Sequence, residues 1–154
     1  VKRDGIPYEL IEKALPTIEG EVNDILAQMV DFGIVLEMDG KNINTYLAYD
    51  DDNVWPLELS SGMERFISSL AMRVGLINVC NLPRANFLAI DEGFGNMDSD
   101  NLNSVYSLFQ YLKSQFQFAF IVSHIESMRD TVDSLLEISK ENGFSQLKLP
   151  SKFN

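Results

Sequence analysis

The sequence is poor in the residues that most often mark disulfide scaffolds and metal centres. It has one cysteine, Cys80, and one histidine, His124, among 154 residues. A single cysteine excludes an internal disulfide framework and is typical of a reducing compartment. No apolar run reaches the roughly 18 residues that a membrane helix needs. The first residues, VKRDGIPY, also lack the pattern of a signal peptide, so we expect a cytoplasmic location and no membrane partner.

Basic residues are also scarce. Lysine and arginine number 12 against 23 aspartates and glutamates, and the net charge is −11. Surfaces that dock on nucleic acids are rich in basic side chains. The charge therefore argues against this segment being the main nucleic-acid surface, and such contact is expected only through other segments. With 45% hydrophobic residues and 10 phenylalanines, the chain can form one globular domain with a substantial core.

The first 30 residues carry a helical pattern. Their apolar positions are four and three residues apart in alternation, which forms one seam along an α-helix and resembles heptads. The seam comprises Ile11, Leu15, Ile18, Val22, Ile25 and Met29. Pro16 lacks an amide hydrogen, so we expect it to kink this helix or to begin a second one. The pattern fits an ordinary core helix and, equally, the last stretch of a coiled coil that enters a globular head.

The rest of the chain alternates strands and helices. Short strands are predicted at 33–38 and 43–49 around a turn at 39–42, and at 134–139 and 145–149 near the end. Helices are predicted from Gly62 to about Cys80, at 100–114 and briefly from about Ile125. Segments 85–90 and 118–123 are apolar almost throughout, as parallel strands covered on both faces are. These elements predict an α/β domain with a mostly parallel sheet flanked by helices.

A polar loop at 49–56 carries three consecutive aspartates at 50–52. Carboxylates bind cations when their spacing suits a coordination sphere, and this segment lacks such spacing. We interpret the loop as a solvated turn.

The stretch FLAIDEGFGNMD, 87–98, carries the strongest chemical signal. A predicted buried strand delivers Asp91 and Glu92 at its carboxyl end, where open α/β sheets bind ligands. Adjacent carboxylates on extended backbone point in opposite directions. One can hold Mg²⁺, often through water, while the other polarises an attacking water. The same residues also fit a plain turn that ends a strand.

His124 follows the second predicted buried strand. A lone histidine often has a structural role. Here it comes at the end of a strand that we expect to neighbour the Asp91 strand, where an imidazole can hydrogen-bond a terminal phosphate or the attacking water.

The segment LSSGM, 59–63, comes at the start of a predicted helix. Ser60 and the backbone amide of Gly62 would stand where unpaired N–H groups and the helix dipole favour an anion. Taken alone, this segment fits a plain serine N-cap.

Together these segments resemble a known family. LSSGM, FLAIDE, GNMD and IVSHIE follow in the order of the signature motif, Walker B, the D-loop and the switch-histidine loop of ABC-type ATPase heads in SMC and SbcC-like DNA-repair proteins. The first 30 residues are similar to the segment where the returning coiled coil enters such a head, and 132–149 to its closing strands. The resemblance implies coiled-coil return helices at 1–30 and the C-terminal ATPase lobe at 31–154, within a single domain 1–154.

The resemblance also implies roles for individual residues. Asp91 would hold Mg²⁺, Glu92 would act as the catalytic base and His124 would contact the γ-phosphate of ATP. Asp98 would couple the two ATP sites of a head dimer. Four signature residues would face the ATP bound by the opposite head: Ser60, Ser61, Gly62 and Met63.

Two positions depart from the family pattern. Ser61 replaces the first signature glycine, and its side chain either adds a hydrogen bond or loosens the fit around the phosphate. Met63 stands where glutamine or glutamate is usual, so a polar contact is in doubt. Arg65 is expected either to reach nucleotide or the facing head, or to pair with Glu64.

No Gly-x-x-x-x-Gly-Lys-Ser/Thr segment occurs in these 154 residues, and the Gly-Lys pair at 40–41 has Val35 and Asn42 at the flanking motif positions. The resemblance implies that this phosphate-binding loop belongs to an N-terminal Walker A lobe and that two complete heads sandwich two ATP molecules. The fragment alone would then be inactive.

The segment Asp-Glu-Gly-Phe-Gly, 91–95, is most similar to SbcC-type ATPases that partner an exonuclease in double-strand-break repair. The expected partners are a Walker A lobe, a second head, a nuclease subunit and DNA, with the protein at the nucleoid or in the nucleus. Two alternatives are an SMC-like head that tethers or entraps DNA and an interaction module that has lost catalysis. The presence of Asp91, Glu92 and His124 argues against the last.

Overall fold

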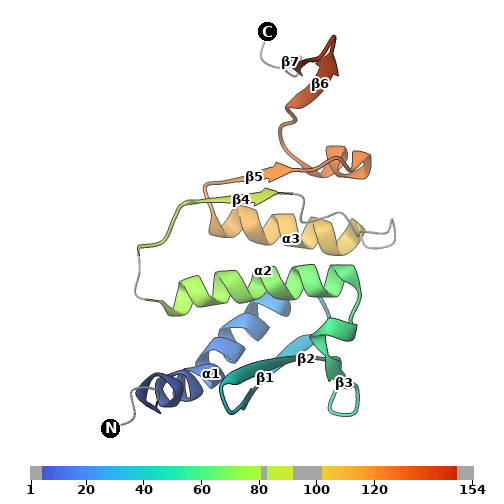
Figure 1. Cartoon of the computed structure of the whole chain (residues 1–154). Coiled ribbons are helices and arrows are strands. Elements are labelled where there is room, and N and C mark those ends of the chain that lie inside the picture. The colour runs from blue at the N-terminus through green and yellow to red at the C-terminus, as the bar shows by residue number, and fades with distance from the viewer. Residues whose placement is uncertain (1–4, 81–82, 92–101, 149–154) are drawn as a thin grey trace. The chain divides into compact units, whose positions relative to one another are not determined.

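The structure is a computed structural model, and it describes residues 5–80, 83–91 and 102–148 (Figure 1). The chain divides into two compact units, Val1–Ser123 and His124–Asn154. Each unit is described by itself. The predicted Glu92 and Asp98 lie outside the described residues.

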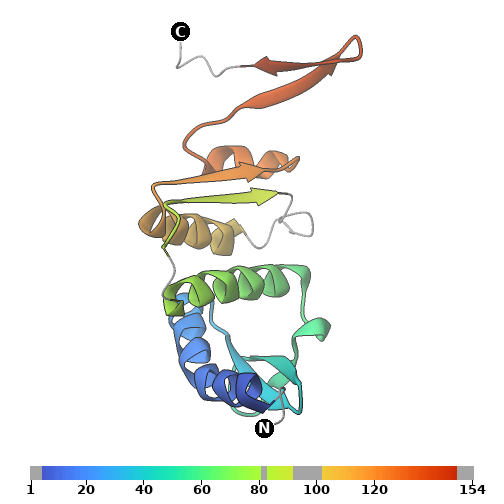
Figure 2. The same ribbon diagram turned by 60° about the vertical axis from the view of Figure 1, so that its left-hand side comes forward.

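Helix α1 (Gly5–Leu26) contains Pro16 in its interior. It is one helix whose axis changes direction along its length (Figure 2), which agrees with the predicted kink and not with a second helix start. It buries Leu15, Val22 and Ile25, whereas Leu10 near its start is 63% exposed. The apolar seam therefore packs on the core from Leu15, the residue before the proline, onward.

An antiparallel sheet follows, with β1 (Gly33–Asp39), β2 (Asn42–Ala48) and β3 (Val54–Pro56) in that order. The predicted hairpin is confirmed, and Gly40 adopts φ +60° at the first of two turn positions, where tight hairpins favour glycine. Strand β3 was not predicted, because its three residues lie in the segment interpreted as a loop.

The free edge of β1 is covered by side chains from α1. Asn23 accepts from the amide of Ile34 at 2.8 Å and donates to its carbonyl at 2.9 Å. Glu19 accepts from the amide of Leu36 at 2.7 Å. Edge strands expose unpaired backbone groups, so these polar residues of α1 satisfy three of the outward backbone groups of β1.

A 3-10 turn, η1 (Leu57–Leu59), leads into α2 (Gly62–Val79). The predicted helix is confirmed, and its apolar stripe includes buried Met63, Ile67, Leu70 and Val74. It crosses α1 closely at Gly75, where a Cβ atom would lie 2.9 Å from Cγ2 of Val22. The crossing therefore depends on the absence of a side chain at residue 75.

Strand β4 (Phe87–Asp91), helix α3 (Leu102–Gln115) and β5 (Phe118–Val122) form a βαβ unit. The strands pair in parallel, with Phe87 opposite Phe118 and Asp91 opposite Val122. The expectation that these two strands are neighbours is confirmed. Helix α3 lies along one face of the pair (Figures 1 and 2) and buries an apolar stripe that includes Val105, Phe109 and Leu112.

The prediction that both strands are buried is wrong for this chain. Only Ile90 of β4 is buried, while Phe118 is 58% and Phe120 52% exposed. Side chains alternate between the faces of a strand, and the register places Phe87, Phe118, Phe120 and Val122 on one face. Because α3 covers the opposite face, this apolar face has no cover within the described part of the first unit.

The second unit contains η3 (Glu126–Thr131) and a hairpin of β6 (Glu137–Glu141) and β7 (Phe144–Lys148). The predicted short helix is a 3-10 helix, and the predicted strand at 134–139 begins later. The turn is formed by Asn142 and Gly143, both with positive φ, and the register places Glu141 opposite Phe144.

The α/β class predicted from the sequence is confirmed. Among the described strands, parallel pairing occurs between β4 and β5, whereas the short connections within β1–β3 and β6–β7 permit only antiparallel pairing. Of the helices that the structure describes, none combines the length and the apolar character needed to cross a bilayer.

Candidate functional site: the start of α2 and the end of β4

The start of α2 is fixed by a reciprocal cap. The N-cap is Ser61, whose Oγ accepts from the amide of Glu64 at 3.2 Å, while a Glu64 carboxylate oxygen accepts from the amide of Ser61 at 2.5 Å. This is a capping box. Ser60 is not the cap: it is 8% exposed, and its hydroxyl donates to the carbonyl of Leu57 at 2.7 Å.

The backbone amides of the next two residues are not hydrogen-bonded in this way. Within the described residues, Gly62 and Met63 have no acceptor for their N–H groups, as expected of the first two positions of a helix. These groups and the helix dipole favour an anion. The thioether side chain of Met63 is buried, so Met63 presents its backbone and not a polar side chain at this end of the helix.

Ser61 therefore accounts for one of the two departures from the signature pattern. A glycine at this position has no side chain and cannot supply the oxygen that caps Glu64. The Ser61 hydroxyl is turned to its own helix by that hydrogen bond.

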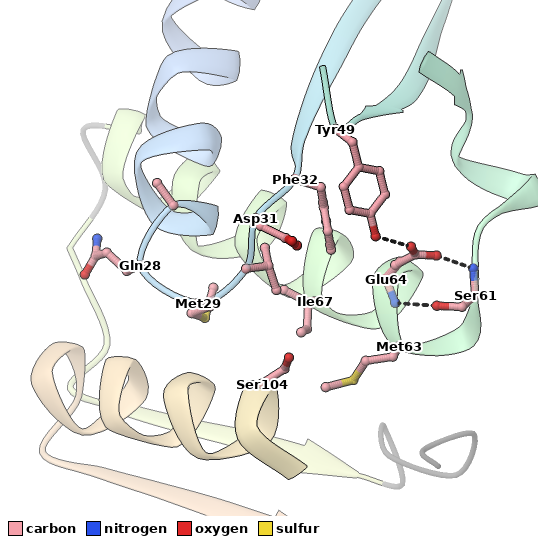
Figure 3. A pocket seen from close by; sticks show the side chains of 12 residues that line it. Gln28, Met29, Asp31, Phe32, Tyr49, Ser61, Met63, Glu64, Ile67 and Ser104 are labelled. Atoms are coloured by element: carbon pink, nitrogen blue, oxygen red, sulfur yellow. Dashed lines mark hydrogen bonds between the residues drawn. The ribbon is translucent and has the colours of Figure 1, made fainter. Parts of the chain in front are cut away.

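Glu64 joins this cap to the sheet. Its second carboxylate oxygen accepts from the hydroxyl of Tyr49 at 2.7 Å, and the three side chains meet in Figure 3. Burial raises the pKa of Tyr49 to about 12, with the Glu64 hydrogen bond contributing. Burial acts to raise the pKa of Glu64, but hydrogen bonds from Tyr49 and Ser61 outweigh it and lower that pKa. A neutral phenol and an ionised carboxylate are therefore the stable pair near neutral pH.

These residues lie beside an open cleft of about 470 Å³ in the first unit. Tyr49, Ser61, Met63 and Glu64 contribute to its wall, together with Asp31 and Phe32 from the segment before β1.

Arg65 does not pair with Glu64. Its Nη1 donates to the carbonyl of Glu58 at 3.0 Å, so the predicted ion pair is wrong. The sequence carried a signal against this ion pair that was missed. The spacing Ser-x-x-Glu at 61–64 is the signature of a capping box, in which Glu64 turns back to the Ser61 amide.

Asp91 ends β4 and is exposed. It lies on the face that carries Phe87 and Phe118, next to Val122 of β5. A single exposed carboxylate at the carboxyl end of a parallel strand suits Mg²⁺, which usually takes one or two carboxylates and completes its shell with waters and phosphate oxygens. Within the described residues no three histidine, cysteine, aspartate or glutamate side chains gather as a metal site.

His124 is the first residue of the second unit, and it is exposed. It follows Val122, the last residue of β5, by two positions. Its contact with the γ-phosphate of ATP stays a prediction.

The aspartates of the 49–56 loop form the expected turn. Asp50 Oδ1 accepts from the amides of Asp52 at 3.0 Å and Asn53 at 2.9 Å. The side-chain amide of Asn53 also bonds this carboxylate and, with the amide of Asp52, lowers the pKa of Asp50. Asp50 thus serves the turn geometry.

The chain is similar to known proteins over most of its length. It is 34% identical to uncharacterized protein R555 of Acanthamoeba polyphaga mimivirus over 160 aligned residues, covering 94% of this chain and 12% of that protein. It is 33% identical to the SbcC subunit of the SbcCD nuclease of Pseudomonas aeruginosa, over 58% of this chain and 8% of that protein. No protein-family model matches the chain.

The fold matches that of solved SMC heads. A structure from work on ATP-driven dimerization and DNA-stimulated activation of SMC ATPases aligns with a TM-score of 0.74 at 16% identity, over 93% of this chain and 89% of that one. The chain belongs to the SMC/SbcC-like family of ABC-type ATPase heads. It is the C-terminal lobe of such a head. The Smc head of Pyrococcus furiosus, bound to the C-terminal domain of ScpA, matches with a TM-score of 0.68 at 18% identity, over 94% of this lobe and 37% of that chain.

The lobe spans only about a tenth of the length of the curated relatives that it matches. Membership in an ATPase family implies a nucleotide site, and that the start of α2 and the end of β4 contribute to it stays a prediction. Relatives and structures thus agree with the family that the order of the four motifs indicated.

Proposed function

We propose that this lobe is half of an ATP-binding and ATP-hydrolysing head of an SbcC-like ATPase that acts with a nuclease in DNA double-strand-break repair. The observation that carries the proposal is the pairing of two features on one chain. One is a helix start with unpaired amides at Gly62 and Met63, and the other is an exposed Asp91 at the end of a parallel strand. Neither feature includes a phosphate-binding loop.

A Walker A lobe is the partner that the uncovered face of β4 and β5 favours. This face presents Phe87 stacked on Phe118, with ring centroids 5.5 Å apart, and continues to Phe120 and Val122. Large apolar faces of this kind mark interaction surfaces. An N-terminal lobe covering it would also bring a phosphate-binding loop to the end of β4, beside Asp91.

The residues would act as follows. Asp91 would hold Mg²⁺, which supplies charge neutralisation at the phosphates when bound. Glu92 would orient and deprotonate the attacking water, and His124 would hydrogen-bond the γ-phosphate. The amides of Gly62 and Met63 would bind the phosphates of ATP held by the facing head. Asp98 would couple the two sites. Hydrolysis would then release a dimer that ATP binding had closed.

Two features relate this lobe to its wider assembly, the start of α1 and the net charge. Leu10 and Ile11 are exposed near the start of α1, which supports the proposal that 1–30 returns from a coiled coil to the lobe at 31–154. The net charge of −11 favours DNA contact through other segments.

The second candidate is an SMC-like head that tethers or entraps DNA. The observation in its favour is that solved SMC heads share the fold, one of them bound to part of ScpA. Their identity to this chain is 16–18%, whereas the SbcC relatives reach 33–34%. The sequence comparison therefore favours the nuclease-associated branch.

Joining this lobe to the Walker A lobe of its own protein is expected to produce an ATPase. The joined head should hydrolyse ATP, the lobe alone should not, and the joined head with Asp91→Asn should lose nearly all turnover because its metal ligand is weakened. Steady-state phosphate release at matched protein concentrations measures this. A joined, folded head that binds no ATP would contradict the proposed function.

A further inference from the structure

The Tyr49–Glu64 hydrogen bond joins two elements that are far apart in the sequence. Tyr49 directly follows β2, and Glu64 lies in the first turn of α2. The carboxylate of Glu64 accepts from the Tyr49 hydroxyl through one oxygen and from the Ser61 amide through the other. Glu64 therefore makes one hydrogen bond within the first turn of α2 and one to the residue that follows β2 of the three-stranded sheet.

Tyr49 is held firmly enough to serve as an anchor. Its ring lies 5.6 Å from that of Phe32 and 5.6 Å from that of Trp55, measured between centroids. Its amide also donates to the carbonyl of Asn53 at 3.1 Å. Tyr49 is 41% exposed, so these two ring contacts, the backbone hydrogen bond and the bond to Glu64 are what limit the positions of its hydroxyl.

The anchored carboxylate determines where the free amides of α2 point. Glu64 holds the Ser61 amide, and the next two N–H groups along the chain are those of Gly62 and Met63. A hydrogen bond to an ionised group is stronger than one between neutral groups. Loss of the Tyr49 hydroxyl would leave Glu64 attached only to its own helix and would free the helix start to move relative to the sheet.

We propose that Tyr49 is a positioning residue that acts through Glu64 to hold the start of α2 in the orientation that binds the phosphates of a neighbouring head's ATP. The inference rests on the proposed function. It concerns the closing of the head dimer and not the binding of ATP to the Walker A lobe of the same head.

The test uses the complete head and the variant Tyr49→Phe, which keeps the ring and its packing and removes only the hydroxyl. The matched control is Tyr46→Phe on β2, since the Tyr46 hydroxyl has no hydrogen bond to the part of the chain that the structure describes. We expect Tyr49→Phe to raise the ATP concentration for half-maximal dimerisation by about 3- to 10-fold. ATP affinity of the monomeric head should stay unchanged.

A second variant keeps the proposal testable if Tyr49→Phe also lowers stability. Glu64→Ala should shift dimerisation in the same direction, and adding Tyr49→Phe to it should cause no further shift, because the tyrosine acts through the carboxylate. Equal dimerisation of the Tyr49→Phe and Tyr46→Phe heads, or additive effects in the double variant, would overturn the inference. Failure of the unmodified head to dimerise with ATP would instead overturn the proposed function.

Discussion

Replacing Glu92 by glutamine in the complete protein is expected to abolish ATP turnover while ATP-induced head dimers accumulate. Glutamine keeps the size and hydrogen-bonding reach of the side chain but cannot take a proton from water. General-base catalysis contributes about 100- to 10,000-fold, so turnover should fall by at least about 100-fold. Dimers that form on ATP binding would then persist, because hydrolysis no longer opens them.

Two measurements made together distinguish the loss of the catalytic base from a general loss of folding. Phosphate release reports turnover, and size-exclusion chromatography with ATP reports the dimer. The neighbouring Asp91→Asn is the contrasting variant: it weakens the metal ligand, so it should reduce both turnover and ATP-dependent dimers. If Glu92→Gln retained normal turnover, Glu92 would not be the base.

Replacing Gly75 by leucine should unfold or strongly destabilise the first unit. A Cβ atom at residue 75 would lie 2.9 Å from Cγ2 of Val22 and 3.5 Å from its backbone nitrogen. Val22 is fully buried and cannot move aside without shifting α1. Overpacking a core typically costs 1–3 kcal/mol and sometimes more, and we expect about 3 kcal/mol or more here because the three further carbons of leucine must also enter this close helix crossing.

The control is the same substitution at Gly20. This residue also lies inside a helix, and nothing lies within 4 Å of the place a Cβ would occupy. Leucine is a better helix former than glycine by up to about 1 kcal/mol, so Gly20→Leu should be neutral or stabilising. Urea unfolding followed by circular dichroism measures both variants. Equal stability of the two would show that α1 and α2 do not cross closely at Gly75.

The local elements were predictable because they are encoded by short-range patterns. The alternation in 33–49 with Gly40 at the turn gave the first hairpin, and the apolar stripe of 62–79 gave α2. In the second hairpin the first strand was predicted too early, at 134–139 instead of Glu137–Glu141, while the last strand was predicted to within one residue. The pair Asn142-Gly143 is the usual signal for a tight turn with positive φ, and weighing it would have set the strands correctly.

Two features were not predictable in the same way: what packs on the faces of β4 and β5, and which residues distant in sequence come into contact. The apolar sequence of β4 and β5 indicates that both faces are suited to burial, but it does not say that the second cover comes from this chain. The bond between Tyr49 and Glu64 spans 15 residues and depends on how β2 and α2 pack. In the candidate site, the order of motifs identified Ser61 and Asp91 as site residues. Their hydrogen bonds and exposure could be described only from the structure.

The serine cluster shows the difference most clearly. From the sequence, Ser60 and the Gly62 amide were the expected phosphate contacts, and the Ser61 side chain was expected either to add a hydrogen bond or to loosen the fit. In the structure Ser60 donates inward to Leu57, and Ser61 caps the helix. What is available to a ligand is backbone, from Gly62 and Met63: the Gly62 amide followed from the position of the helix start, whereas the inward turn of the Ser60 hydroxyl required the structure.

The division of the ATP site between two lobes can be tested by an ATP titration, using isothermal calorimetry on the 154-residue lobe alone and joined to its Walker A lobe. We predict no submicromolar binding to the lobe alone, because Asp91 and the amides of α2 each contribute to a site completed by other groups. The joined head should bind one ATP per head in the presence of Mg²⁺. Submicromolar affinity of the lobe alone would show that it holds more than part of the site.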